Sequence, residues 1–489
     1  MSTPESLACL PWWKVFKDPV LQEQIEEALK NNYDLRIAIS RIEQARARRI
    51  QARAEFFPQL GYSGGAERAR TPGSTIPATN TPPTTLNVGG TAVTIPGSSA
   101  PEMEVSGPTV NTFTVQGAAS WEIDLWGRIR RSNEVALANL LATEEARRGV
   151  VQSLVAEVAR AYFELRALDT ELEISREAVS SFQQTLDLFT KQQAGGVASD
   201  LEVSRGTASL ASAAAAIPRI EQQIVEAENR LSILLGRNPG PIRRGTTLLG
   251  QKMPPKVPAG IPCDLLERRP DLRQAEQRLV AANAEVGIAI TNFLPRVDLT
   301  AGAGVVSPAL HKLTNGTWNV WNVGGGISGP IFQGGRLVGV YKETKARWQE
   351  AVLDYERIAL NAFREVSDAL SAREKYAQAR VQQETQVGAL QQSVKLATDR
   401  YTIGISTYYE VLEAQQQLFP AQVSLTQTRL NQLLAVVNLY SALGGGWLDE
   451  CGPKNTTVVP ATSVVPVSKE RASGRPKTSA ATRPETAKP

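Results

Sequence analysis

Apolar residues in this chain follow two different spacings, and each spacing predicts a different element. Between Leu154 and Gln193 they step by alternating four and three residues for more than five heptads, which predicts a coiled-coil-like helix. The same stepping from Ile217 to Leu234 predicts a helix that returns along the first, and Val387 to Tyr401 repeats the end of the seam. A helix from Gly335 to Tyr401 would be about 100 Å long, a length that no compact globular core needs.

Before each long helix, apolar and polar residues alternate with a period of two, which predicts strands with one apolar and one polar face. The apolar positions of the two longer stretches include Phe113, Val115, Trp121, Trp321, Val323 and Ile327. Shorter alternating stretches precede them, at residues 60–66 and 297–305. The chain therefore offers two β-hairpins, four strands in all.

The two halves of the chain are copies of one plan. A shift of 208 residues aligns Gly127-Arg128 with Gly335-Arg336 and continues to Gly444, and upstream a shift of 237 aligns residues 34–36 with 271–273. The two shifts differ by 29 residues, which are extra sequence in the first copy. They fall in a Thr/Pro/Gly/Ser-rich run, residues 71–108, whose composition predicts a long exposed loop.

These features divide the chain into five parts. The first repeat, 34–236, contains a helix, a β-hairpin at 59–126 with the long external loop, and a long helical hairpin. The second repeat, 271–447, contains a helix, a β-hairpin at 295–332 and a second long helical hairpin. An N-terminal segment, 1–33, a linker, 237–270, and a tail of disordered composition, 448–489, complete the chain.

Charge and residue usage argue against several classes of function. The net charge is +4, but the segment after Cys451 has seven basic and two acidic residues, so the basic balance belongs to the tail and predicts no nucleic-acid surface. Three cysteines without metal-ligand spacing and one histidine predict no enzyme, no metal site and no cofactor. No apolar run is long enough for a transmembrane helix, and the start shows no signal peptide, which taken alone predicts a cytosolic protein.

The strands and helices together favour a different location. Four strands with one apolar face fit either a sheet packed on a soluble core or part of a transmembrane barrel. The apolar residues of the heptad seams pack against each other, so the helices leave no apolar layer to cover the sheet. Because four strands are too few to close a barrel and an open edge is costly in lipid, several chains must contribute. A barrel continued by long helices would form a conduit, and physics alone leaves two, three or four subunits open.

Several segments are specific enough to indicate a family. AEFFPQLG, WEIDLWGR, GVASDLEVSRG, FLPRVDLTAG, PIFQGGR and RYTIGISTYYEVLEAQQQLF occur in this order. In this respect the chain, from Trp12 to Trp447, resembles the TolC-like outer-membrane efflux proteins, in particular the OprM-like lipoprotein branch that serves RND-type multidrug pumps. The resemblance implies an α+β membrane channel: a homotrimer with a twelve-stranded β-barrel in outer-membrane lipid, a coiled-coil α-helical tunnel in the periplasm, and an equatorial belt that includes residues 12–32 and 237–265.

The resemblance also implies a function and partners. The channel would be the passive exit duct of a tripartite efflux pump for small toxic compounds, with a periplasmic adaptor and an inner-membrane RND-type transporter docked at the helix tips. It places Tyr401, Tyr409, Glu410 and Glu413 at a periplasmic gate, with Asp200 bonded to Tyr401. Glu410 and Glu413 share one helix face. On a lone helix they would be a solvated face, whereas in a trimer they would form two carboxylate rings that favour cations.

Two Gly-centred corners, residues 194–199 and 402–407, join the helices of each pair, and Gly196 and Gly404 suit a reversal with positive φ. The proposed adaptor contacts are Gly196, Val197, Ser199, Gly404, Ile405 and Ser406. Where TolC itself has a basic residue in this corner, this chain has Ser406, so we expect hydrogen bonds such as Tyr401 to Asp200 to hold the closed state.

The N-terminus departs from the OprM-like pattern. Residues 6–9 only faintly resemble a lipidation signal, so we expect an unmodified Cys9, an incomplete N-terminus, and an outer-membrane location with a periplasmic extension. Two alternatives stay open at this stage: the outer-membrane duct of a type I protein secretion system, and a soluble structural coiled-coil protein.

Overall fold

The computed structural model describes residues 16–70, 84–95, 109–196, 198–254, 268–314 and 318–445. The chain divides into two units, residues 1–449 and 450–489, and every element below belongs to the first. Cys9, Val197 and the predicted tail lie outside the described residues. Within the described ranges, no helix combines the length and the apolar character needed to cross a membrane.

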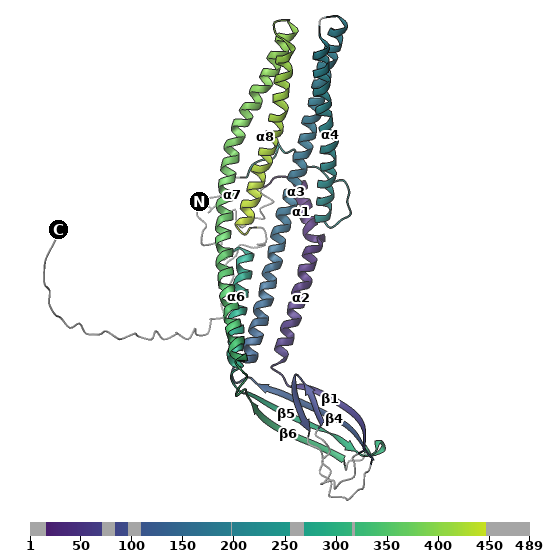
Figure 1. Ribbon diagram of the computed structural model, residues 1–489, viewed down its shortest axis with the longest axis vertical. Coiled ribbons are helices and arrows are strands. Elements are labelled where there is room, and N and C mark those ends of the chain that lie inside the picture. Colours follow the sequence, from purple (N-terminus) through teal and green to yellow (C-terminus); the bar gives the residue numbers. More distant parts are fainter. Residues whose placement is uncertain are drawn as a thin grey trace, which may run out of the picture. The chain divides into compact units, whose positions relative to one another are not determined.

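The described elements are seven α-helices, six strands and one short 3₁₀ helix (Figure 1). The helices are α1 Pro19–Asn31, α2 Tyr33–Ala54, α3 Arg128–Ala194, α4 Asp200–Leu234, α6 Pro270–Thr291, α7 Arg336–Thr402 and α8 Tyr408–Ala442. The strands are β1 Gln59–Arg70, β2 Thr84–Val88, β3 Thr91–Ile95, β4 Thr109–Ile123, β5 Arg296–Ser307 and β6 Asn319–Ser328, with the 3₁₀ helix η3 at Leu310–Lys312.

The elements recur at the spacings at which the sequence aligns with itself. Helices α3 and α7 both have 67 residues, and α4 and α8 both have 35. Each long helix starts after a glycine with positive φ, Gly127 at 82° and Gly335 at 83°. At the start of α3 the Asp124 carboxylate accepts hydrogen bonds from the N–H groups of Ile129 and Arg130, at 3.1 and 3.0 Å, which satisfies donors that a helix N-terminus leaves unpaired.

The helices pack side by side in an order that their contacts define. In the half next to the sheet the order is α2, α3, α6, α7, and in the half with the corners it is α4, α3, α8, α7 (Figure 1). Helix α7 therefore forms one edge of this wall, while α2 and α4 form the other. Helix α3 lies inside and contributes much of the main core, where Tyr162, Phe163 and Leu165 are fully buried.

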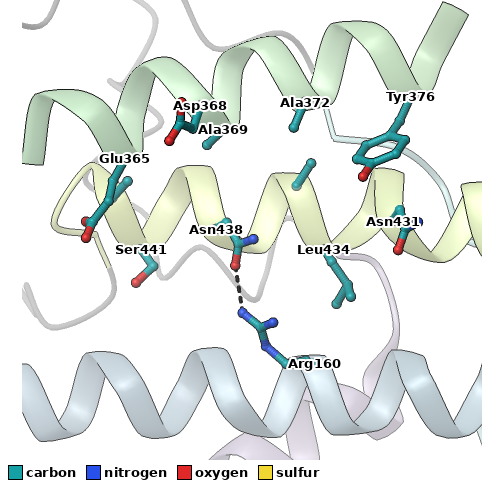
Figure 2. Close-up of a pocket in the computed structure, with 12 residues that line it drawn as sticks. Arg160, Glu365, Asp368, Ala369, Ala372, Tyr376, Asn431, Leu434, Asn438 and Ser441 are labelled. Carbon is teal, nitrogen blue, oxygen red and sulfur yellow. Dashed lines mark hydrogen bonds between the residues drawn. The ribbon is translucent and has the colours of Figure 1, made fainter. Parts of the chain in front are cut away.

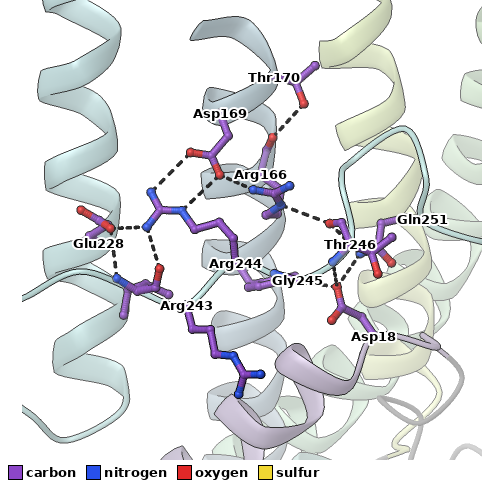
Figure 3. Close-up of polar contacts among 12 residues, drawn as sticks. Asp18, Arg166, Asp169, Thr170, Glu228, Arg243, Arg244, Gly245, Thr246 and Gln251 are labelled. Carbon is purple, nitrogen blue, oxygen red and sulfur yellow. Dashed lines mark hydrogen bonds and ion pairs between the residues drawn. The ribbon is translucent and has the colours of Figure 1, made fainter. Parts of the chain in front are cut away.

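Helix α1 and the linker are held to α3 by a buried polar network (Figure 3). The Asp18 carboxylate is fully buried and accepts hydrogen bonds from the Tyr162 hydroxyl at 2.7 Å, the Gln251 amide at 2.7 Å and the Thr246 N–H at 3.1 Å. The Gly245 N–H donates to the Tyr162 oxygen at 3.1 Å. Because a buried carboxylate without partners is costly, these bonds fix the linker on α3.

The main sheet is antiparallel in the order β1-β4-β5-β6, with β1 and β6 at its edges. Its register sets Gln59 opposite Ser120, Ser120 opposite Thr300 and Thr300 opposite Gly324. Residues opposite one another share a face, so one face is polar and small. The other face carries the apolar positions, among them Leu60, Tyr62, Val115, Trp121, Leu299, Trp321, Val323 and Ile327.

The first copy's extra sequence contains a second sheet, the β2–β3 hairpin at residues 84–95. Its Leu86, Val88, Val93 and Ile95 are buried against the polar face of the main sheet. The prediction of an exposed loop is therefore wrong for residues 84–95. Loop-like composition concealed a short alternation of apolar and polar residues that buries one face of the hairpin.

Candidate functional site

Both helical hairpins turn at glycines in the left-handed region, as their sequences predict. The φ angles are 74° at Gly196 and 78° at Gly404. The Gly196 N–H donates to the Gln193 carbonyl at 2.9 Å, and the Gly404 N–H donates to the Tyr401 carbonyl at 3.0 Å. These bonds satisfy carbonyls that a helix C-terminus leaves unpaired. The backbone prediction for the two corners is confirmed.

An aromatic cluster joins the two corners. Tyr408 is buried, and its ring meets the Phe189 ring of α3 with centroids 3.6 Å apart. Tyr401 lies edge-on to both, with centroid distances of 6.4 Å to Phe189 and 5.8 Å to Tyr408. Two more contacts tie α8 to the first hairpin: the Gln415 amide donates to the Ser181 hydroxyl at 2.9 Å, and the Gln416 amide to the Ser209 hydroxyl at 3.1 Å.

The Tyr401 hydroxyl donates to the side-chain carbonyl of Gln192, near the end of α3. Asp200 instead accepts a hydrogen bond from the Gln193 amide. In place of the expected bond to Asp200, the Tyr401 hydroxyl thus bonds to Gln192, three residues after the Phe189 ring against which Tyr401 packs. Burial raises the pKa of the Tyr401 phenol above its ordinary value; the bond to Gln192 opposes this increase and the Glu202 carboxylate adds to it.

Glu410 and Glu413 line one groove between α7 and α8, with a volume of about 640 Å³. Arg400 lines the same groove, and its guanidinium lies 3.7 Å from the Glu410 carboxylate. Both side chains of this pair are about half exposed, so the pair stabilises the corner by about 0–1 kcal/mol. The Glu413 carboxylate accepts a hydrogen bond from the Gln417 amide at 3.3 Å. Glu410 thus has a basic partner on α7, and Glu413 has an amide partner on α8.

The tips carry exposed apolar side chains. Ile403 and Ile405 in the second corner are 68% and 67% exposed, and Tyr409 beside them is 60% exposed. At the first corner Gly196 and Ser199 are exposed, and the Ser199 N–H donates to the Glu202 carboxylate at 2.7 Å. Ser406 is partly buried. Tyr409 therefore lies apart from the aromatic cluster that holds Tyr401.

A second groove, of about 580 Å³, lies farther along α8 where it meets α3 and α7 (Figure 2). Two polar contacts lie in it: the Arg160 guanidinium donates to the side-chain oxygen of Asn438 at 2.9 Å, and the Glu365 carboxylate lies 2.8 Å from the Arg269 guanidinium. Polar contacts in this groove therefore connect neighbouring helices of the wall.

The family model described as "Outer membrane efflux protein" matches residues 24–237 and 261–445. The chain belongs to the outer membrane efflux protein family. The two matched stretches correspond to the two repeats, and the family membership makes this chain an outer-membrane component of an efflux pump.

Individual relatives of this efflux protein agree with the assignment. The chain is 35% identical over 445 residues to the probable efflux pump outer membrane protein TtgC of Pseudomonas putida, covering 91% of this chain and 87% of TtgC. Its structure is similar to crystal structures of CusC, with a TM-score of 0.77, 30% identity and coverage of 91% and 97%. It is also similar to the outer membrane channel CmeC of Campylobacter jejuni, with a TM-score of 0.80, 25% identity and coverage of 92% and 95%.

Sequence reasoning missed four residues of this site: Phe189, Gln192, Arg400 and Tyr408. Phe189 belongs to the heptad seam, which signalled its burial but not its aromatic partners. Gln192 and Tyr408 carried no signal of their own, because their role depends on which helix faces which. Arg400 could have been found, since it precedes the corner on the helix that the two glutamates face.

Proposed function

We propose that three copies of this efflux protein close into one conduit, with a twelve-stranded barrel in the outer membrane and a helical tunnel in the periplasm. Through it the pump would discharge small toxic compounds. The second helical hairpin would form the gate. The observation that carries the proposal is a sheet whose apolar face is exposed and whose polar face is covered.

The burial of the sheet is the reverse of that expected for a protein in water. Tyr62, Trp321 and Val323 on the apolar face are 91%, 77% and 76% exposed. Gln116 and Ser120 on the polar face are 3% and 4% exposed. An apolar face of this size needs a non-aqueous partner, and outer-membrane lipid in contact with a barrel wall supplies one.

The edges support closure by copies of the same chain. Strand β1 follows α2 at one edge of the sheet and of the helical wall, and β6 precedes α7 at the other. Head-to-tail contacts between unlike edges produce closed rings when the rotation fits. Pairing β6 of one copy with β1 of the next would remove the open edges, which lipid does not tolerate. Three copies of the four-stranded sheet would give twelve strands, within the range of bacterial outer-membrane barrels.

Helix α7 carries an apolar seam on this edge. Leu353, Leu360, Phe363 and Leu370 follow heptad spacing and are 65%, 70%, 40% and 42% exposed. Such a seam packs against a neighbouring helix in a coiled coil. We infer that the neighbour is α2 or α4 of the next copy, where Ile50, Val225 and Ile233 are also exposed.

At the tips, the closed state would be held by the links between the two hairpins, chief among them the bond from Tyr401 to Gln192. Three copies would bring Glu410 and Glu413 into two carboxylate rings, partly offset by Arg400. A periplasmic adaptor that contacts Gly196, Ser199, Gly404, Ile405 and Ser406 would open the gate by binding the open arrangement better, as any ligand must. An inner-membrane transporter would supply the cargo and the energy.

A charge in the α7 seam tests the assembly. Leu360→Asp should turn the trimer into monomers at low concentration, because burying one leucine contributes about 1.5–3 kcal/mol and the trimer has three such contacts. Asn361→Asp is the matched control: it adds the same charge at the adjacent exposed position on another face. Light scattering in detergent measures the mass. Trimers of equal stability in both variants would contradict the proposed edge contact.

A further inference from the structure

We propose that the β2–β3 hairpin is a movable plug inside the barrel, a second gate distinct from the helix tips. The inference rests on the proposed function, because it needs the barrel to close. Its basis is the face on which the hairpin lies. The apolar face of the main sheet is exposed and would meet lipid, so the opposite face, which the hairpin covers, lines the lumen.

The contacts place the hairpin along the lumenal face. The Ser120 hydroxyl donates to the Val88 carbonyl at 2.7 Å, and the Asn322 amide donates to the Thr94 carbonyl at 3.3 Å. A Cβ at Gly89 in the turn would lie 2.6 Å from the Gln59 side chain, at the first residue of β1 and close to the end of α2. The turn therefore points along the sheet toward the helical tunnel.

Small residues in the sheet make room for the hairpin. A Cβ at Gly61 would lie 3.0 Å from Val88, and a Cβ at Gly302 would lie 2.6 Å from Ile95. The opposite face of the hairpin is polar and exposed, with Thr85, Asn87 and Thr94. The hairpin thus buries an apolar face against glycines and presents a polar face to the lumen.

The dimensions decide how much of the lumen the hairpins occupy. Twelve strands about 4.8 Å apart and tilted about 40° give a circumference of about 75 Å and a radius of about 12 Å. A hairpin packed face to face on the wall has its backbone about 10 Å inside the wall. Three hairpins would therefore meet at the axis and block the lumen, so export of a drug-sized molecule requires that they move.

The attachment is suited to such movement. The hairpin forms a sheet of its own and is not paired with β1, β4, β5 or β6. A two-stranded hairpin is at best marginally stable in water, so its order depends on the side chains that it buries on the wall. Displacement would break few backbone bonds and would leave the barrel wall intact.

Cross-linking tests the geometry. In a chain whose three cysteines are replaced by alanine, Asn87→Cys should form disulfide-linked dimers within the trimer upon oxidation, because the three polar faces converge at the axis. Glu67→Cys is the control: it lies on the same lumenal face, outside the hairpin, where the radius of the wall keeps the copies about 20 Å apart. Gly302→Leu should abolish the Asn87→Cys link, whereas Gly325→Leu, on the lipid face of the next strand, should not.

The same disulfide tests the role in export. Cells with oxidised Asn87→Cys trimers should lose at least about tenfold of their resistance to an exported compound, and a reductant should restore it. Deletion of residues 84–95 provides an independent variant that cannot be locked. Intact trimers that never cross-link at residue 87, or linked trimers that export normally, would overturn the plug. Absence of trimers in the parent would instead refute the proposed function.

Discussion

Removal of one hydroxyl at the helix tips should open the proposed gate. Tyr401→Phe deletes the donor to Gln192 but keeps the ring in place against Phe189 and Tyr408. A neutral hydrogen bond contributes about 1 kcal/mol. If the three copies of the proposed trimer open together, the closed state loses about 3 kcal/mol, which shifts the ratio of closed to open channels about 150-fold.

Single-channel recording in planar bilayers measures that ratio as open probability. Tyr33→Phe is the matched control, because it removes the same group from an exposed residue of α2, in the half of the helices next to the sheet. Gln192→Leu should reproduce the effect of Tyr401→Phe, and the double variant should add little, since both remove one bond. Equal open probabilities for Tyr401→Phe and Tyr33→Phe would contradict the proposed role of this bond. A larger effect of Asp200→Ala would restore Asp200 as the partner.

Two further predictions concern the Asp18 network. Gly245→Ala should destabilise the protein by about 1–3 kcal/mol, because its Cβ would lie 2.4 Å from an Asp18 carboxylate oxygen and 2.6 Å from the Tyr162 hydroxyl. Gly240→Ala is the control, because the nearest atom to its Cβ would be 3.9 Å away. Thermal unfolding should show a loss of stability for Gly245→Ala and no change for Gly240→Ala. Burial, and then the hydrogen bond to Asp18, raises the pKa of Tyr162 above its ordinary value of 10.0. The unfolded chain therefore releases this proton first, so stability is full below pH 10.0 and falls above it. Tyr162→Phe should lack this alkaline loss; equal slopes in denaturant unfolding would exclude Tyr162 as its source.

Local patterns explain why much of the fold could be predicted. The heptad seam and the alternation of apolar residues indicate which side of each helix or strand is apolar. Both periods follow from backbone geometry alone. The glycines at positions 196 and 404 indicate a positive φ, because few other residues adopt that conformation at low cost. The comparison of the two halves placed their shared elements, since copies of one plan fold alike.

Three features needed the tertiary structure: the partner of Tyr401, the hairpin that covers the polar face of the main sheet, and the network around Asp18. Tyr401 and Gln192 are 209 residues apart, and Asp18 and Gln251 are 233 apart. No local pattern indicates which helix faces which. The resemblance to relatives predicted Asp200 as the hydrogen-bond partner of Tyr401, whereas the structure has Gln192 in that role. The sequence by itself determined elements, their repeat and their turns, because these depend on neighbouring residues. Only the tertiary structure decided which side chains meet, because that depends on how α3, α7 and the sheet pack together.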